Sequence, residues 1–190
     1  MIAVVQRVSE ASVCISGQIK GKIGLGFLVL LGIAHADTAE DVDWLAKKIT
    51  GLRVFSDSDG KMNLDLQAVG GNILLISQFT LHASTKKGNR PSFIEAARPE
   101  VAVPLYQKMI AQLNQELGQA IETGEFGADM QVSLCNDGPV TIVIDSKNRI
   151  WPTRAAPVGH IHKGSNYFLG FAATGMVMAT GSQFITLFSK

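Results

Sequence analysis

The sequence predicts an α+β domain: a largely antiparallel sheet, curled toward a β-barrel, with two main helices. Strand-like runs of β-branched residues dominate both ends of residues 1–149, and two segments of helical periodicity lie between them. Strands and helices that are segregated along the chain favour an α+β domain over an alternating α/β fold. Hydrophobic residues make up 46% of the chain and charged residues 17%, which indicates a folded globular protein rather than a disordered one.

The expected strands are defined by β-branched residues and by the alternation of apolar and polar positions. A hairpin is predicted at Gly17-Gln18. The run 26–33 is almost entirely apolar and too short for a convincing helix, so it is placed at the centre of the sheet. In chain order, the expected strands are 2–8, 11–16, 19–23, 26–33, 73–81, 122–126, 130–135 and 140–144.

Two helices are predicted from apolar residues that recur at helical spacing. Thr38 and Asp41 resemble a capping box at the start of the first helix, and Pro99 is a common first residue for the second. The residues expected to face the core are Val42, Leu45, Ile49 and Leu52 in the first helix, and Leu105, Met109, Leu113 and Leu117 in the second.

No metal site is expected. Asp57, Asp59 and Lys61 alternate as in a calcium-binding loop, but no acidic residue stands where such a loop places its bidentate Glu. The Asp59-Gly60 pair therefore indicates a plain turn. His160 and His162 could share one side of a strand, yet they lack the further Cys, His or carboxylate ligands that a zinc site needs.

The cysteines and the N-terminal residues indicate a cytoplasmic protein. Cys14 and Cys135 fall in strand-like runs and are interpreted as small buried hydrophobic residues rather than as a disulfide. Free cysteines are typical of a reducing compartment. The residues after Met1 do not form the charged segment, long apolar segment and cleavage site of a secretory signal.

The charge distribution excludes a broad nucleic-acid-binding surface. The net charge is +1, but residues 1–149 hold 14 basic and 16 acidic residues, whereas residues 150–190 hold three basic residues and no acidic one. Any contact with RNA is therefore expected from a local patch, for which Lys86, Lys87 and Arg90 are the candidates.

Two polar stretches at strand ends are the candidate site. Ser77-Gln78-Phe79-Thr80-Leu81 (SQFTL) ends a buried apolar run, so it brings hydroxyls, an amide and backbone N–H groups to the mouth of the core. Asn136 to Thr141 (NDGPVT) lies between two strand-like runs, and Gly138-Pro139 is a rigid corner that can present two carbonyl oxygens. We expect these two stretches to build one site.

The chemistry of this site lacks an obvious general base. His35 and His82 have no neighbouring residues at the spacing of a catalytic triad, and no glycine-rich phosphate loop is present. A site of hydroxyls and amides can still hydrolyse an activated ester if backbone N–H groups stabilise the oxyanion, at about 3 to 4 kcal/mol per donor. The amides of Phe79 and Thr80 are the candidate donors. The plainer alternative is that Ser77 and Thr80 only satisfy the end of the sheet.

The opening residues 3–8, the SQFTL motif, Arg90-Pro91-Ser92-Phe93 and the NDGPVT motif closely resemble the D-aminoacyl-tRNA deacylase (D-tyrosyl-tRNA deacylase) family. The resemblance runs in order from about residue 1 to residue 149. It implies a homodimeric cytoplasmic enzyme without metal or cofactor. Such an enzyme hydrolyses the ester between a D-amino acid, or to some extent glycine, and the 3′-terminal adenosine of tRNA, and it spares the L form.

The resemblance also assigns roles to residues. It implies a cis peptide bond at Gly138-Pro139 and a corner that reaches into the partner's pocket, where two carbonyl oxygens hold the amino group and leave no room for an L side chain. Ser77 and Gln78 match the pocket for the terminal adenosine, with the Phe79 amide as oxyanion donor. Thr80 is expected to position the substrate, and the ribose 2′-hydroxyl of the tRNA assists the reaction. Arg7 and Asn136 are assigned supporting roles.

Residues 150–190 form a C-terminal extension to which the resemblance does not apply. No charged residue lies between Lys163 and Lys190, but glycine, threonine and serine dilute the apolar run 167–188, so no membrane anchor is expected. Extra strands that pack on the domain, a poorly ordered extension and a sequence foreign to the domain stay open.

Two other functions also remain open for the chain as a whole. It could be a non-catalytic module that binds the aminoacyl end of tRNA, or a small-ester hydrolase with Thr80 as nucleophile.

Overall fold

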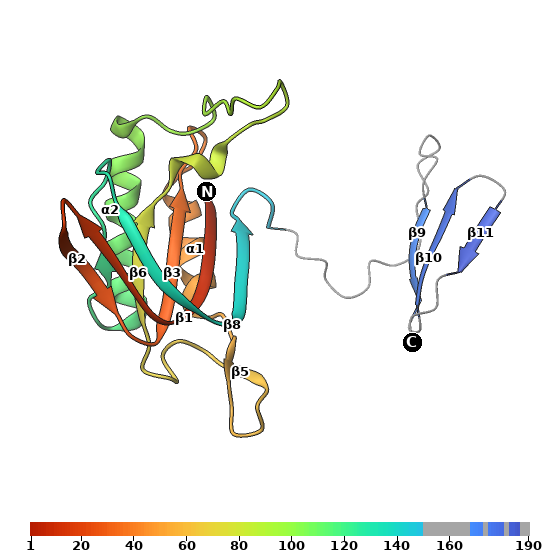
Figure 1. Ribbon diagram of the computed structural model, residues 1–190, viewed down its shortest axis with the longest axis horizontal. Coiled ribbons are helices and arrows are strands. Elements are labelled where there is room, and N and C mark those ends of the chain that lie inside the picture. The colour runs from red at the N-terminus through yellow and green to blue at the C-terminus, as the bar shows by residue number, and fades with distance from the viewer. Residues whose placement is uncertain (150–167, 173–174, 181–182, 187–190) are drawn as a thin grey trace. The chain divides into compact units, whose positions relative to one another are not determined.

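The structure is a computed structural model that describes residues 1–149 in full and residues 168–172, 175–180 and 183–186 as strand backbone (Figure 1). The chain divides into two compact units, Met1–Arg149 and Ile150–Lys190. The elements of the first unit are β1 (Ile2–Ile15), β2 (Gln18–Ile23), β3 (Gly26–Gly32), α1 (Ala39–Thr50), β4 (Phe55–Ser56), β5 (Met62–Leu64), β6 (Asn72–Ser77), the 3₁₀ turn η1 (Phe79–His82), α2 (Pro99–Leu117), β7 (Glu122–Thr123) and β8 (Gln131–Asp145).

The main sheet has the strand order β2-β1-β3-β6-β7, and β8 pairs with β1 as well. β1 is antiparallel to β2, β3 and β8, whereas β6 is parallel to β3 and β7. The sheet is therefore mixed. All three pairs of β1 are antiparallel, and both pairs of β6 are parallel. The two ends of the sheet approach each other, since a Cβ atom on Gly21 of β2 would lie 3.1 Å from the carbonyl oxygen of Thr123 in β7. The α+β class and the curled sheet are confirmed.

Both faces of the central strands are buried, which explains why their sequences are continuously apolar. In β3, Phe27 and Leu31 belong to the core that α1 and α2 cover, whereas Leu28 belongs to a second cluster on the opposite face of the sheet. Ile73 and Leu74 of β6 divide between the two clusters in the same way. Figure 1 shows both helices on one side of the sheet. Each such fully buried side chain stabilises the fold by about 1.5 to 3 kcal/mol.

Several predicted elements have different ends in the structure. The strand predicted over 73–81 ends at Ser77, because the N–H of Gln78 makes the last bond across the sheet, to the carbonyl of Leu31 at 2.8 Å. Residues 79–82 then form η1 instead of continuing the strand. The strand predicted over 122–126 is only two residues long. β8 pairs with β1 on both sides of an outward bulge, residues 137–140.

The two helices follow the prediction closely. Val42, Leu45 and Ile49 of α1 are buried, as are Met109 and Leu113 of α2. The capping box is confirmed, and the expected start of α2 at a proline is confirmed as well. Ala102 and Tyr106 of α2 are also buried, although they were not predicted to be. The prediction was wrong in placing Leu52 within the first helix, because it lies past the end of α1 and is only half-buried, and Leu105 of α2 is half-buried as well.

The acidic run after β4 is the turn of the β4–β5 hairpin. The carboxylate of Asp57 accepts hydrogen bonds from the N–H groups of Asp59 and Lys61, both at 2.9 Å, and from the side-chain amide of Asn63 at 2.6 Å. These bonds hold the pKa of Asp57 below its ordinary value, the bond from Asn63 most strongly. The plain turn is thus confirmed. The burial predicted for the cysteines was wrong, because Cys14 is half-buried and Cys135 is exposed on the outer face of β8.

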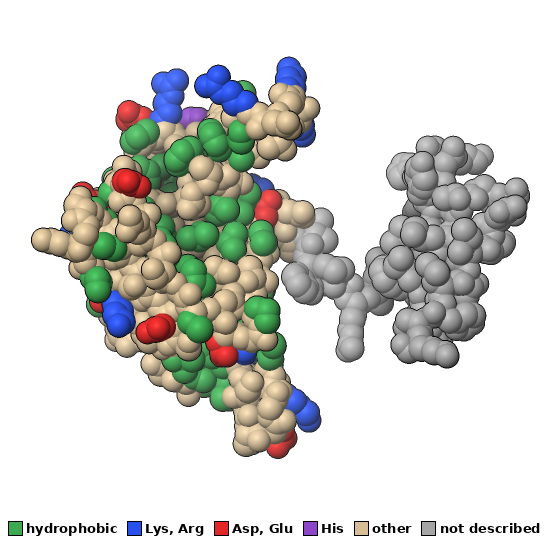
Figure 2. Space-filling model, in the orientation of Figure 1, with side chains coloured by type: hydrophobic (Ala, Val, Ile, Leu, Met, Phe, Trp, Pro, Cys, Tyr) green, Lys and Arg blue, Asp and Glu red, His purple; other side chains and the backbone are tan. Residues whose placement is uncertain are grey.

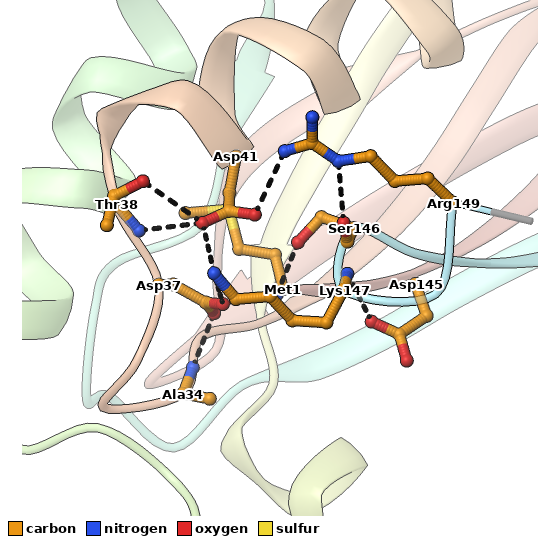
Figure 3. A network of polar contacts seen from close by, with 9 residues as sticks. All are labelled: Met1, Ala34, Asp37, Thr38, Asp41, Asp145, Ser146, Lys147 and Arg149. Carbon is orange, nitrogen blue, oxygen red and sulfur yellow. Dashed lines mark hydrogen bonds and ion pairs between the residues drawn. The ribbon is translucent and has the colours of Figure 1, made fainter.

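A polar network joins the start of β1, the start of α1 and the end of β8 (Figure 3). The ammonium of Met1 is buried, and it donates to Asp37 Oδ1 at 2.6 Å and to Ser146 Oγ at 2.8 Å. Asp41 accepts from Lys147 Nζ at 2.6 Å and from the N–H of Thr38 at 2.8 Å. Burial alone would raise the pKa of Asp41, but these two hydrogen bonds hold it well below its ordinary value.

The second unit contains β9 (Phe168–Ala172), β10 (Gly175–Thr180) and β11 (Gln183–Thr186). They form an antiparallel sheet in the order β11-β10-β9. His160 and His162 lie outside the described residues. Within the part of the chain that the structure describes, no helix is long and apolar enough to cross a membrane.

Candidate active site

The end of β6 and the start of η1 line a cavity of about 260 Å³, called here the first cavity. Ser77, Gln78 and Phe79 form one wall, and Phe126 and Met130 contribute to the other side. Most of the remaining lining is aliphatic. A largely apolar cavity with a few polar groups is typical of a site for a small organic ligand.

Tyr106 of α2 fixes the strand that carries this wall. Its hydroxyl donates a hydrogen bond to the carbonyl of Leu75 at 2.9 Å, from a buried position. Burial raises the pKa of Tyr106, so the hydroxyl keeps its proton and stays a donor. The position of Ser77 is therefore set by a strand that is buried on both faces and held by a side chain of α2.

The start of η1, where Phe79 lines the first cavity, leaves backbone N–H groups without a hydrogen-bond partner in residues 1–149. The N–H of Leu81 donates to Gln78 and that of Ala83 donates to Thr80, which closes the turn. Among the described residues, the N–H groups of Phe79 and Thr80 have no backbone partner. Backbone N–H groups without a partner are the kind of donor that can stabilise an oxyanion.

The hydroxyl of Thr80 is exposed and accepts a hydrogen bond from Gln78 Nε2 at 2.5 Å. Within residues 1–149, no carboxylate or imidazole makes a hydrogen bond to it. A threonine that acts as a nucleophile needs a base to take its proton. The observed contact orients the side chain and does not activate it.

The Gly138-Pro139 corner is exposed, its peptide bond is cis, and Gly138 has φ +130°. Asn136 ties the two sides of the bulge together. Its Oδ1 accepts from the N–H of Val140 at 2.8 Å, and its Nδ2 donates to Thr141 Oγ1 at 3.1 Å.

Arg7 supports the corner through contacts with Asp137, the residue before Gly138. The Arg7 side chain is buried, and its Nε donates to the carbonyl of Asp137 at 2.9 Å while its Nη1 donates to the carbonyl of Val54. The Asp137 carboxylate lies 3.2 Å from Nε and pairs with the charge. A Cβ atom on residue 138 would lie 2.8 Å from both Arg7 Nη2 and Val140 Cγ2, and residues with a side chain rarely adopt the positive φ found there, so the position favours glycine.

The two predicted stretches do not meet within one chain. Arg7, next to the corner, pairs with Phe27 of β3, and Phe27 pairs with Ile73 of β6, whereas Ser77 pairs with Leu31. The corner and Ser77 are thus separated by roughly 13 Å along the strands and roughly 14 Å across them. Each stretch is well formed, but one chain alone cannot place the corner over the first cavity.

Sequence reasoning missed the residues that face Ser77 across the first cavity. Phe126 and Met130 lie on either side of a turn at Gly127, and neither belongs to a motif. It also missed that Phe79 packs edge-on against Phe93, with ring centroids 5.2 Å apart. An aromatic residue next to a glycine was the only available signal at residue 126, and it is a weak one.

Comparison with known proteins gives a consistent result. The family model described as D-Tyr-tRNA(Tyr) deacylase matches residues 4–145. The D-aminoacyl-tRNA deacylase of Cytophaga hutchinsonii is 62% identical over 149 residues, which are 78% of this chain and 99% of that protein. The D-aminoacyl-tRNA deacylase of Parabacteroides distasonis is 56% identical with the same coverage.

Two solved structures have the same fold as the first unit. The c-Myc DNA unwinding element binding protein is 42% identical, with a TM-score of 0.72 over 76% of this chain and 98% of that chain. A probable eukaryotic D-amino acid tRNA deacylase is 14% identical, with a TM-score of 0.66 over 75% of this chain and 97% of that chain, and it supports the fold alone. The family that the motifs resemble is therefore confirmed: the chain belongs to the D-Tyr-tRNA(Tyr) deacylase family.

Proposed function

We propose that this protein hydrolyses the ester between a D-amino acid, or glycine, and the 3′-terminal adenosine of tRNA, and that it spares the L form. The main support is the first cavity, where free backbone N–H groups stand beside Ser77 and Gln78 with no general base, in a chain whose relatives are named D-aminoacyl-tRNA deacylase. An aminoacyl ester is already activated, so oxyanion stabilisation and positioning suffice for its hydrolysis.

The terminal adenosine occupies the first cavity in this proposal. The base lies against Phe126 and Met130, and Ser77 and Gln78 hold the ribose and the ester at the mouth. The N–H of Phe79 stabilises the oxyanion, and the 2′-hydroxyl of the tRNA ribose supplies the assistance that a protein base would give. Thr80 positions the substrate through its contact with Gln78.

The protein acts as a homodimer in this proposal, and each corner completes the partner's site. Three observations support a second copy: the separation of the two stretches in one chain, the exposure of Gly138 and Pro139, and the apolar side chains around them. Leu134 and Val143 of β8 are 39% and 63% exposed, and hydrophobic side chains are visible on the face that carries β8 (Figure 2). Burial of such residues favours association.

Chiral selection follows from the corner. The carbonyl oxygens of Gly138 and Pro139 accept hydrogen bonds from the substrate's ammonium, and the space beside them admits the Cα hydrogen of a D residue but not the side chain of an L residue. Arg7 and Asn136 keep the corner in this shape. We further propose that residues 1–149 are the deacylase domain, that the protein is cytoplasmic, and that the reaction needs no metal or cofactor.

The decisive experiment compares two enantiomers on one tRNA. The purified protein is mixed with D-Tyr-tRNA and, separately, with L-Tyr-tRNA, and release of free amino acid is followed. We expect D-tyrosine to be released at least about 100-fold faster, a difference of about 2.7 kcal/mol. Equal rates would refute chiral selection. Binding of both forms without release would instead favour a non-catalytic module for the aminoacyl end of tRNA.

A further inference from the structure

A second cavity of about 710 Å³ lies beside the first and is lined by the end of η1, by residues of the loop over residues 83–95, and by Ile2. We call it the basic groove, because Lys86, Lys87 and Arg90 line it and Glu95 is the one acidic residue in its lining. None of these three cations forms an ion pair within residues 1–149. Figure 2 shows Lys and Arg side chains projecting at the top of the domain, where Figure 1 places this loop.

The base of the loop that carries the cations is fixed by backbone hydrogen bonds. Ser84 and Ser92 exchange two backbone hydrogen bonds of 2.8 and 2.9 Å, and Ala97 donates to the carbonyl of Ile33 at 2.8 Å. Hydroxyl groups of Ser84, Thr85 and Ser92 also line the groove. Hydroxyls and cations together are the groups that bind phosphate in proteins.

The basic groove adjoins the first cavity through an aromatic pair. Phe79 lines the first cavity and packs edge-on against Phe93, whose chain neighbours Ser92 and Ile94 line the groove. Phe79 and Phe93 are 57% and 37% exposed. A chain that leaves the first cavity past this pair therefore enters the groove.

We propose that the basic groove binds the backbone phosphates of the single-stranded RNA end whose terminal nucleoside occupies the first cavity; this rests on the proposed function. The first cavity has room for one nucleoside-sized ligand, so the preceding nucleotides must lie outside it. Residues 1–149 carry more acidic than basic residues, so their overall charge does not attract RNA. The affinity for tRNA then depends on this local cluster of cations, and the partner's corner stays free to read the amino acid.

The test measures binding rather than turnover. Lys86→Ala/Lys87→Ala is compared with Lys20→Ala/Lys61→Ala, which removes two exposed lysines that do not line the groove. Uncharged tRNA and free adenosine are titrated against each protein between about 50 and about 200 mM salt. We expect the groove variant to bind tRNA about tenfold more weakly at low salt. The slope of the logarithm of the binding constant against the logarithm of the salt concentration should become shallower by about 0.7 for each phosphate that the variant no longer neutralises. Adenosine affinity should be unchanged, and the control should match the wild type.

A second variant, which is expected to increase the affinity for tRNA, controls for a loss of binding that results from misfolding. Glu95→Gln removes the acid from the groove lining and should tighten tRNA binding several-fold while leaving adenosine binding unchanged. The proposal is overturned if wild type binds no tRNA, if the lysine variant binds tRNA like wild type, or if adenosine affinity falls equally. The proposal is also overturned if the lysine variant loses affinity for blunt duplex DNA as much as for tRNA, since that result indicates a surface that binds any polyanion. A wild type that binds tRNA but leaves D-aminoacyl esters intact refutes the proposed function alone.

Discussion

The two halves of the proposed site are stabilised in different ways. The corner lies on an exposed bulge and is held by side chains, namely the buried Arg7 below it and Asn136 across it. The first cavity is held by backbone and core, because Ser77 ends a strand that is buried on both faces. Side-chain hydrogen bonds from Tyr106 to the carbonyl of Leu75 and from Gln78 to Thr80 add to this.

This difference suits the different roles proposed for the two halves. Discrimination between enantiomers depends on sub-ångström placement of carbonyl oxygens, and buried, satisfied polar contacts give that rigidity. Binding of a nucleoside needs only a stable apolar surface and a few donors. Substitutions at the two halves should therefore change different quantities.

The largest effect is expected for Arg7→Ala, which should disrupt the backbone conformation of the Gly138-Pro139 corner. The substitution removes the hydrogen bonds to Asp137 and Val54 and leaves their carbonyls without that donor. Hydrogen bonds that involve a charged group each contribute about 1.5 to 3 kcal/mol, so the loss of these two bonds should lower the free energy of unfolding by about 3 to 6 kcal/mol. Turnover of D-Tyr-tRNA should fall at least about 100-fold, while adenosine binding, measured by titration, should persist.

Arg7→Lys is the matched control. Lysine keeps the charge but cannot donate in two fixed directions, so its activity should be intermediate. If Arg7→Ala bound adenosine as weakly as it turned over substrate, the division between the halves would be wrong. Retention of full selectivity by Arg7→Ala would contradict the role of Arg7 at the corner.

The same contrast explains how far the sequence could predict this molecule. The central strands were predictable because Phe27, Leu28 and Ile73 belong to unbroken apolar runs that are too short for a helix and are typical of strands covered on both faces. The start of α1 was predictable because Thr38 and Asp41 form a local pattern. Such features depend on residues that are near one another in the chain.

Features that depend on distant residues were not predictable. The end of β6 is decided by the bond from Gln78 to Leu31, and propensity alone extends the strand to Leu81. The far wall of the first cavity depends on where the turn around Gly127 packs. Cys135 was assigned to the core from its apolar neighbours, but on β8 it faces outward. The distance between the two motifs depends on strand order, which no local pattern contains.

An intermediate effect is expected for Asp41→Asn, which tests whether stability alone decides selectivity. Asp41 is nearly fully buried and accepts from Lys147 and Thr38. Its loss should lower the free energy of unfolding by about 2 kcal/mol, as measured by urea denaturation, but leave the ratio of D to L turnover unchanged. A changed ratio would mean that the corner responds to general destabilisation.

The pH dependence of this variant has a defined sign. Because the folded-state pKa of Asp41 lies below its ordinary value, the stabilisation is complete above about pH 4 and is lost as the pH falls further. The wild type should therefore lose stability more steeply than Asp41→Asn below that pH. Asp43→Asn on the same helix breaks an exposed pair with Lys108, so it should change stability by less than about 1 kcal/mol at any pH. Parallel pH profiles for the wild type and Asp41→Asn would contradict this account.

The smallest effect is expected at Thr80, on the cavity side. Thr80→Val keeps the shape and removes the hydroxyl that accepts from Gln78. If Thr80 only positions the substrate, kcat should fall about tenfold, the equivalent of one ordinary hydrogen bond. Thr80→Ser should stay close to the wild type. A nucleophile would behave differently, because its removal costs on the order of 10⁴-fold or more in kcat. Single-turnover rates for the two variants therefore separate positioning from covalent catalysis, and a fall of that size in Thr80→Val would restore the small-ester hydrolase alternative.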